Sequence, residues 1–141
     1  DSTTDSCMVV SGGHTGDYSL ATSFEPCLRA QEIDLIAEGF SEAELDEAPI
    51  IVASEWFKQV VSADEYDFRV QLLAADGTEI ASINLDGTTS TSDWFEVSNT
   101  FSDYGTGLRR IRIEDGGVDT AFWAGHYGVQ LDDASVVLTA P

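Results

Sequence analysis

Basic residues are scarce in this chain, and their scarcity excludes several classes of partner. The 141 residues include 26 Asp and Glu but only 6 Lys and Arg, which gives a formal net charge of −20 at pH 7. A chain this acidic repels the phosphate backbone of nucleic acids and the surface of an anionic membrane. We therefore expect no nucleic-acid partner. The acids are dispersed along the whole sequence, which indicates a general surface property and not one charged site.

Long apolar runs are also missing. The sequence has no stretch of 18 or more apolar residues and no basic start followed by an apolar segment, so it predicts no transmembrane helix and no signal peptide. We expect no membrane insertion. The opening DSTTDS, residues 1–6, has the small and acidic composition of a linker, whereas residues 7–141 suit a single domain. The expected protein is a monomeric module of a larger protein.

Cysteine is nearly absent, and the two that occur leave two interpretations open. Cys7 and Cys27 allow one internal pairing. In an exported protein, a bridge across this loop would contribute about 3 kcal/mol in the chain-entropy model. In a reducing cytosol, both would remain small buried side chains. The count alone does not decide between these two states.

The common signatures of catalysis and metal binding are missing. There is no glycine-rich phosphate loop, no Gly-x-Ser-x-Gly elbow and no Cys-x-x-Cys or His-x-x-x-His pair. His14 and His126 lie too far apart in sequence to indicate a triad, and we interpret Asp132 and Asp133 as the solvated start of a strand. We expect no enzyme and no cofactor. A structural Ca²⁺ held by carboxylate and carbonyl oxygens is the alternative left open.

Patterns of period two dominate what is present. Apolar and polar residues alternate as a half-buried strand requires at residues 66–74, 94–101 and 108–115. Further strands are expected at residues 7–10, 32–37, 50–57 and 134–139. Asp76 and Gly77 predict a tight hairpin turn, and Ser41 and Glu44 have the spacing of a capping box for one helical turn. These short strands predict an all-β, two-sheet antiparallel β-sandwich.

One segment concentrates aromatic side chains. In AFWAGHYG, residues 121–128, the aromatic rings and a histidine stand among small residues: Phe122, Trp123, His126 and Tyr127. An aromatic face can cover the apolar C–H face of a pyranose, and Gly125 and Gly128 permit backbone conformations that lift side chains toward a ligand. The alternative is that these rings plug the core beneath a loop.

A resemblance to a known family becomes specific at this segment. The joint pattern comprises Phe-Glu-x-Cys (residues 24–27), Gln-x-Ile-Asp-Leu (31–35), Phe-x-Asp-Tyr-x-x-Gly (101–107) and Gly-Gly-x-Asp-x-x-x-Trp-x-Gly (116–125). In order and content, residues 22–139 resemble the F-box-associated domain, the sugar-recognising module of a group of F-box proteins. The resemblance implies a jelly-roll sandwich similar to galactose-binding modules, in which loops at one end hold the chitobiose core of N-glycans.

The resemblance also implies which residues bind the sugar. The positions corresponding to the family's site are Phe24, Asp64, Phe122, Trp123 and Ala124, with His126 and Tyr127 beside them. Trp123 and Phe24 keep the family's aromatic residues. A lysine is replaced by Ala124, a tyrosine hydroxyl is lost at Phe122, and an aromatic residue is replaced by His126. The stacking platform is thus retained while two polar groups are lost.

Two functions follow as expectations. The first is a non-catalytic, lectin-like module that recognises a glycan or glycoprotein, of the N-acetylglucosamine, chitobiose or N-glycan core type. The alternative is a structural or protein-interaction module of the same fold that has lost sugar binding. The sequence contains no helical F-box segment ahead of the sandwich. We therefore expect a secreted or cell-surface module used outside the ubiquitin ligase pathway.

Overall fold

The computed structural model describes residues 7–121 and 128–141, the side chain of Cys7 excepted. The described residues form ten strands and one short helix. In chain order these are β1 (Cys7–Ser11), β2 (Tyr18–Thr22), β3 (Cys27–Asp34), α1 (Glu42–Asp46), β4 (Ile50–Lys58), β5 (Glu65–Leu73), β6 (Glu79–Asn84), β7 (Gly87–Thr88), β8 (Phe95–Phe101), β9 (Arg110–Val118) and β10 (Gln130–Thr139). No helix among these residues is long and apolar enough to span a bilayer.

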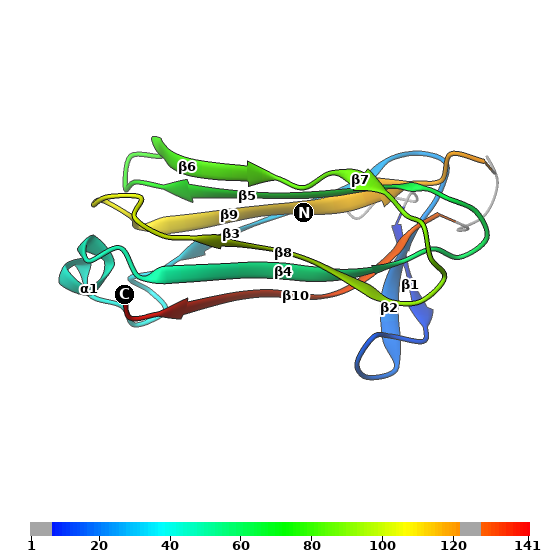
Figure 1. Cartoon of the computed structure of the whole chain (residues 1–141), viewed down its shortest axis with the longest axis horizontal. Coiled ribbons are helices and arrows are strands. Elements are labelled where there is room, and N and C mark those ends of the chain that lie inside the picture. Colours follow the sequence, from blue (N-terminus) through cyan, green and yellow to red (C-terminus); the bar gives the residue numbers. More distant parts are fainter. Residues whose placement is uncertain (1–6, 122–127) are drawn as a thin grey trace.

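The strands form two antiparallel sheets that face each other. One sheet has the order β1-β2-β10-β4-β8, and the other has the order β3-β9-β5-β6 with β7 paired to β5. Figure 1 shows the two layers lying along the long axis, with α1 at one end. The predicted two-sheet antiparallel β-sandwich is confirmed.

The core lies between the two sheets and follows the alternation read from the sequence. Phe68, Val70 and Leu72 on β5 are fully buried, as are Ile111 on β9 and Phe57 on β4. Their polar neighbours point to solvent, because successive side chains of a strand lie on opposite faces. Burial of these apolar side chains is the main force that holds the sheets together.

The predicted local signals are confirmed as well. The Glu44 amide donates to Ser41 Oγ over 3.1 Å and the Ser41 amide donates to Glu44 Oε1 over 3.1 Å, which is a capping box at the start of α1. Between β5 and β6, Gly77 takes a φ of 88°, and the Thr78 amide donates to Asp76 Oδ1 over 2.9 Å. The turn joins two paired strands, as the sequence predicted.

Two predictions of strand boundaries were wrong. The strand expected at residues 32–37 runs instead from Cys27 to Asp34, because Asp34 Oδ1 accepts hydrogen bonds from the amides of Ile36 and Ala37 and turns the chain. The strand expected at 134–139 begins at Gln130. Asp132 and Asp133 are therefore not the start of a strand; they lie within β10, where its pairing with β4 is interrupted by a bulge.

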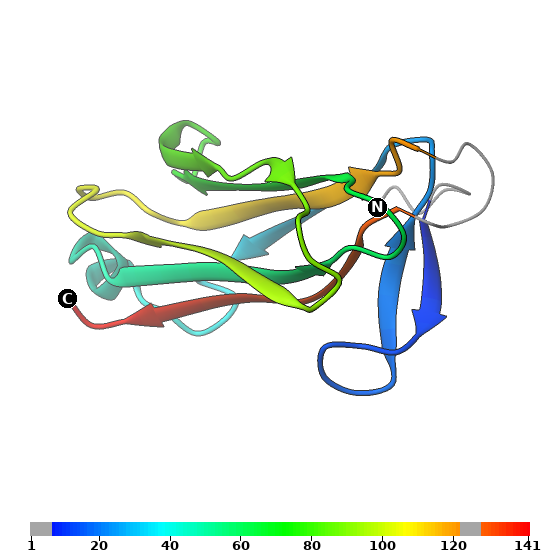
Figure 2. The same ribbon diagram turned by 45° about the vertical axis from the view of Figure 1, so that its right-hand side comes forward.

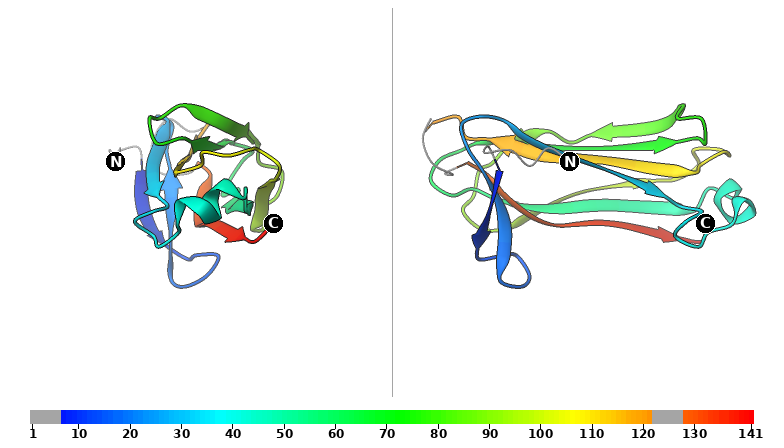
Figure 3. Two further views of the ribbon diagram at one scale, coloured as in Figure 1. Left: turned by 90° about the vertical axis from the view of Figure 1, so that its left-hand side faces the viewer. Right: turned by 180° about the vertical axis from the view of Figure 1, so that it is seen from behind.

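Strands β1 and β2 form a ribbon that leaves the sandwich. Strand β2 pairs with β10 only at Gln130 and Leu131, whereas β1 pairs with β2 along its whole length. Figures 2 and 3 show this ribbon crossing the direction of the other strands. Its connecting turn is tied to the β10 bulge, where Thr15 Oγ1 donates to Asp133 Oδ1 over 2.7 Å.

Candidate functional site at the loop end

Loops from both sheets meet at the end of the sandwich opposite α1. They are the β2–β3 loop (residues 23–26), the β4–β5 loop (59–64), the β7–β8 loop (89–94) and the β9–β10 loop (119–129). Backbone hydrogen bonds connect them: the Asp119 amide donates to the Ser23 carbonyl over 2.7 Å, and the Thr89 amide to the Asp64 carbonyl over 2.8 Å. We call this region the loop end.

Asp64 supports the first residues of the β9–β10 loop from below. Its side chain is fully buried, and its Oδ1 accepts a hydrogen bond from the Thr120 amide over 2.9 Å. Its own amide donates to Thr89 Oγ1 over 2.9 Å. Burial raises the pKa of the Asp64 carboxyl, since the charged form loses its hydration, and the nearby Asp119 carboxyl raises that pKa further. Asp64 thus fixes the start of the β9–β10 loop through its hydrogen bond with the Thr120 amide.

Gly128 fixes the other end of the same loop. Its amide donates to the Thr22 carbonyl over 3.1 Å, and Thr22 Oγ1 donates to the Val129 carbonyl over 3.0 Å. A Cβ at position 128 would collide with Thr22 Oγ1 and would come within 2.9 Å of the Asp119 amide nitrogen. Space therefore requires a glycine at this position, whatever conformational freedom it also supplies.

The sequence-predicted site residues divide into two groups. Phe24 lies in the β2–β3 loop with 47% of its surface exposed, and Asp64 is buried a short way beneath Thr120. The remaining predicted residues lie outside the described residues: Phe122, Trp123, Ala124, His126 and Tyr127. The flanks of that segment, Ala121 and Gly128, both belong to the loop end. A direct contact between Asp64 and a ligand stays a prediction, because in this arrangement its carboxyl faces the protein.

Of the two states that the sequence left open for Cys7 and Cys27, the structure describes one side only. Cys27, the first residue of β3, is buried and disulfide-bonded. The side chain of Cys7 lies outside the described part of the structure, so its pairing with Cys27 remains a prediction.

An aromatic cluster on the outer face of the first sheet was not anticipated from the sequence. The His14 ring stacks on Trp56 at 3.8 Å between centroids and meets the edge of Trp94 at 5.9 Å. His14 Nδ1 lies 2.7 Å from Asp133 Oδ2, and the hydrogen bonds from His14 and Thr15 lower the pKa of the Asp133 carboxyl. These partners are distant in sequence, so no local pattern could have joined them.

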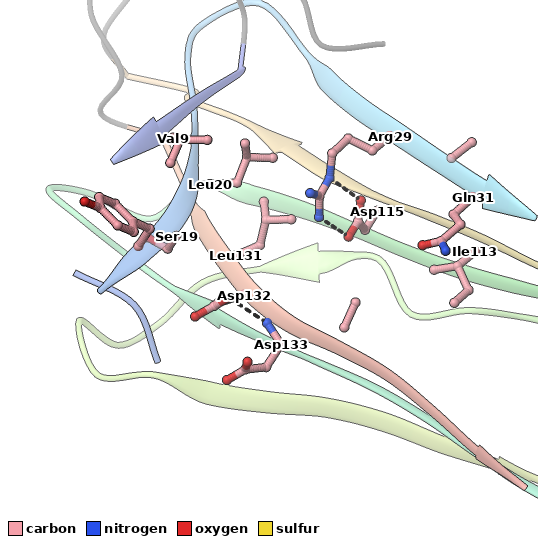
Figure 4. Close-up of a pocket in the computed structure, with 13 residues that line it drawn as sticks. Val9, Ser19, Leu20, Arg29, Gln31, Ile113, Asp115, Leu131, Asp132 and Asp133 are labelled. Atoms are coloured by element: carbon pink, nitrogen blue, oxygen red, sulfur yellow. Dashed lines mark hydrogen bonds and ion pairs between the residues drawn. The ribbon is translucent and has the colours of Figure 1, made fainter. Parts of the chain in front are cut away.

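A polar cluster lies inside the sandwich, between β3, β4 and β9. Arg29 donates to Asp115 through two bonds, Nε to Oδ1 over 3.0 Å and Nη2 to Oδ2 over 2.6 Å (Figure 4). The fully buried Glu55 has its Oε2 3.7 Å from Arg29 Nη2. Burial, with the neighbouring Asp115 carboxylate, raises the pKa of Glu55 to about 11. One sequence signal was available, because Glu55 stands between Ala53 and Phe57 at an inward position of β4.

Neither the His14 cluster nor the Arg29 cluster forms a metal site. Within residues 7–121 and 128–141, no group of three or more His, Cys, Asp or Glu side chains could hold a metal ion. Asp132 and Asp133 are hydrogen-bonded to the β1–β2 turn.

The family model for the F-box associated region matches residues 3–138. The chain belongs to the F-box associated family. F-box only protein 6 of Bos taurus is 44% identical over 124 residues, which cover 84% of this chain and 47% of that protein. F-box only protein 6 of Homo sapiens is 41% identical over 141 residues, covering 91% and 48%, respectively. This F-box associated chain thus spans about half the length of these relatives.

Solved structures with the same fold share little sequence with this F-box associated domain. The CBM22-1 xylan-binding domain of Paenibacillus barcinonensis Xyn10C aligns with a TM-score of 0.54 at 14% identity, covering 98% of this chain and 85% of that one. The carbohydrate-binding module TmCBM61, solved in complex with β-1,4-galactotriose, aligns with a TM-score of 0.56 at 16% identity, covering 96% and 84%. At these identities, the likeness establishes the sandwich fold.

Proposed function

We propose that this F-box associated domain is a non-catalytic carbohydrate-binding module that holds a glycan at the loop end. The observation that carries the proposal is that the chain just before exposed Phe24 is hydrogen-bonded to both sides of the aromatic segment, through the Asp119 amide to Ser23 and the Gly128 amide to Thr22. Neighbours of the same fold are carbohydrate-binding modules, which supports the class of ligand.

The chemistry of the loop end suits a sugar. Trp123 provides a flat indole face for the C–H groups of a pyranose, and Phe24 adds a second apolar surface. Hydroxyl groups of the sugar need placed donors and acceptors, which backbone amides and carbonyls of the loops supply. Asp64 binds the Thr120 amide and Gly128 binds the Thr22 carbonyl, so the chain on both sides of the aromatic segment is attached to the sandwich.

The resemblance to sugar-binding F-box proteins favours chitobiose and the N-glycan core as ligands, presented by a glycoprotein. Ala124 and Phe122 lack the amine and the hydroxyl that orient the sugar in those relatives. Binding then rests on stacking more than on oriented hydrogen bonds. We expect a dissociation constant between about 10 µM and 1 mM.

Calorimetry with chitobiose and a panel of N-glycan cores tests the proposal. Trp123→Ala should weaken binding at the loop end by at least about tenfold, and Phe24→Ala by about tenfold, because each removes apolar contact with the sugar. Trp56→Phe is the matched control, since Trp56 lies beneath His14 on the outer face of the first sheet. Ala124→Lys should strengthen chitobiose binding by restoring a donor.

Two results would overturn the proposal. Unchanged binding in a folded Trp123→Ala variant would eliminate the platform. If the parent domain binds no glycan at all, the structural or protein-interaction module becomes the better interpretation.

A further inference from the structure

A cleft opens on the flank of the sandwich, beside the β1–β2 ribbon. It has a volume of about 500 Å³ and lies between the β1–β2 ribbon on one side and β3 on the other, with β9 and β10 beneath (Figure 4). Pockets that hold small ligands range from about 300 to 1,000 Å³. The cleft is therefore large enough for a sugar ring or two.

The fold explains why the cleft exists. Strand β3 is the last strand of its sheet, and β2 stays beside β10 only at Gln130 and Leu131 before the ribbon diverges. The two sheets are consequently left uncovered along this flank. The ribbon is held apart by its turn, where Asp132 Oδ2 accepts a hydrogen bond from the His14 amide over 2.9 Å.

One wall of the cleft is apolar and carries an aromatic ring. Val9, Tyr18 and Leu20 share one face of the ribbon, since Val9 pairs with Leu20 and Ser11 with Tyr18, and all three line the cleft. Tyr18 is 64% exposed. A tyrosine in that position offers both a ring face for stacking and a hydroxyl for hydrogen bonding.

The opposite wall is polar. The exposed Gln31 amide carries a donor and an acceptor, and deeper in the cleft Arg29 is paired with Asp115. The guanidinium charge is thus balanced by a carboxylate, and Asp132 and Asp133 add negative charge to the lining. Anions are disfavoured in such a cleft, whereas uncharged hydroxyl groups find fixed partners.

We propose that this flank cleft is a second ligand site, which binds a neutral oligosaccharide between Tyr18 and the polar wall of β3. The apolar ring face of the sugar packs on Tyr18, and its hydroxyl groups bond to Gln31 and to the Arg29–Asp115 pair. The site shares no residue with the loop-end platform and does not depend on Trp123.

Titration of the ¹⁵N-labelled chain in the Trp123→Ala background tests this proposal separately from the first one. The probes are chitotriose, xylotriose and β-1,4-galactotriose, and the readout is the displacement of the Tyr18, Ala30 and Gln31 amide signals. We expect at least one trisaccharide to shift these signals in a saturable manner. Adding Tyr18→Ala should weaken that binding about tenfold.

Met8→Ala is the matched control. Met8 is half-exposed on the same ribbon but on the face turned away from the cleft, so its truncation should leave binding unchanged. Equal loss of sugar binding in Tyr18→Ala and Met8→Ala would indicate that the ribbon no longer folds. Gln31→Ala, on β3 outside the ribbon, then tests the site, because it should weaken sugar binding without altering the ribbon.

Two outcomes would overturn the proposal: no trisaccharide shifts the cleft signals, or binding survives both Tyr18→Ala and Gln31→Ala. In the first case, a lysine-rich peptide that shifts the signals would show that the cleft binds a cationic peptide. The loop-end proposal fails instead if the parent domain binds no glycan, or if Trp123→Ala alone leaves chitobiose binding unchanged. The two sites are therefore judged by different variants.

Discussion

The buried carboxyl of Glu55 allows a quantitative test of the polar cluster inside the sandwich. Its pKa is raised from the ordinary 4.5 to about 11, chiefly because burial penalises the charged form. Glu55 is therefore protonated in the folded domain at neutral pH but ionised in the unfolded chain. Glu55→Gln replaces the protonated acid with an amide of the same shape that remains neutral at every pH.

The magnitude follows from linkage. Below pH 4.5, both states of the chain hold the Glu55 proton, and the group adds no pH dependence. Above pH 4.5, only the folded state holds it, so the free energy of unfolding falls by about 1.4 kcal/mol per pH unit up to the folded pKa. Between pH 5.5 and 7.5, Glu55 alone accounts for about 3 kcal/mol of lost stability.

Urea denaturation of the wild type and Glu55→Gln at several pH values measures this difference. The variant should lose stability less steeply with rising pH, and its advantage should grow from pH 5.5 to 7.5. Glu96→Gln, which removes an exposed carboxylate from the adjacent strand β8, controls for the change in net charge. Parallel curves for wild type and Glu55→Gln would refute the reasoning.

Two further predictions concern Gly128 at the loop end and the cysteine at the start of β1. Gly128→Ala should lower the free energy of unfolding by about 1 to 3 kcal/mol, because its Cβ would collide with Thr22 Oγ1, and an unchanged urea midpoint would contradict this. Reduction should lower the melting temperature if Cys27 is bridged to Cys7, with a loss of about 3 kcal/mol. Thiol titration under denaturing conditions checks the bridge, and two free thiols in protein prepared without reductant would disprove it.

Much of the fold could be predicted because its signals are local. Phe68, Val70 and Leu72 alternate with polar residues on β5, and that alternation alone identifies a half-buried strand. Strand β2 was missed for the converse reason. Residues 19–22 are all buried although Ser19 and Thr22 are polar, so the hydropathy pattern does not mark this strand.

The candidate site was less accessible to sequence reasoning. Phe24 is exposed in the β2–β3 loop, and its contact with a sugar stays a prediction. The bracing role of Asp64 depends on Thr120, 56 positions further along the chain, and no pattern in the sequence relates the two. The flank cleft likewise depends on the divergence of the ribbon from β10, which is a property of the assembled sheets.

The anchoring of the aromatic segment has an evolutionary consequence. Asp64 binds the chain at Thr120 and Thr22 binds it at Gly128, so the segment between them is secured by contacts outside residues 122–127. Substitutions within residues 122–127 therefore leave these two attachments in place during evolution. Duplicated copies of such a domain can diverge toward different ligands through a few codon changes, while Asp64, Thr22 and Gly128 are kept constant.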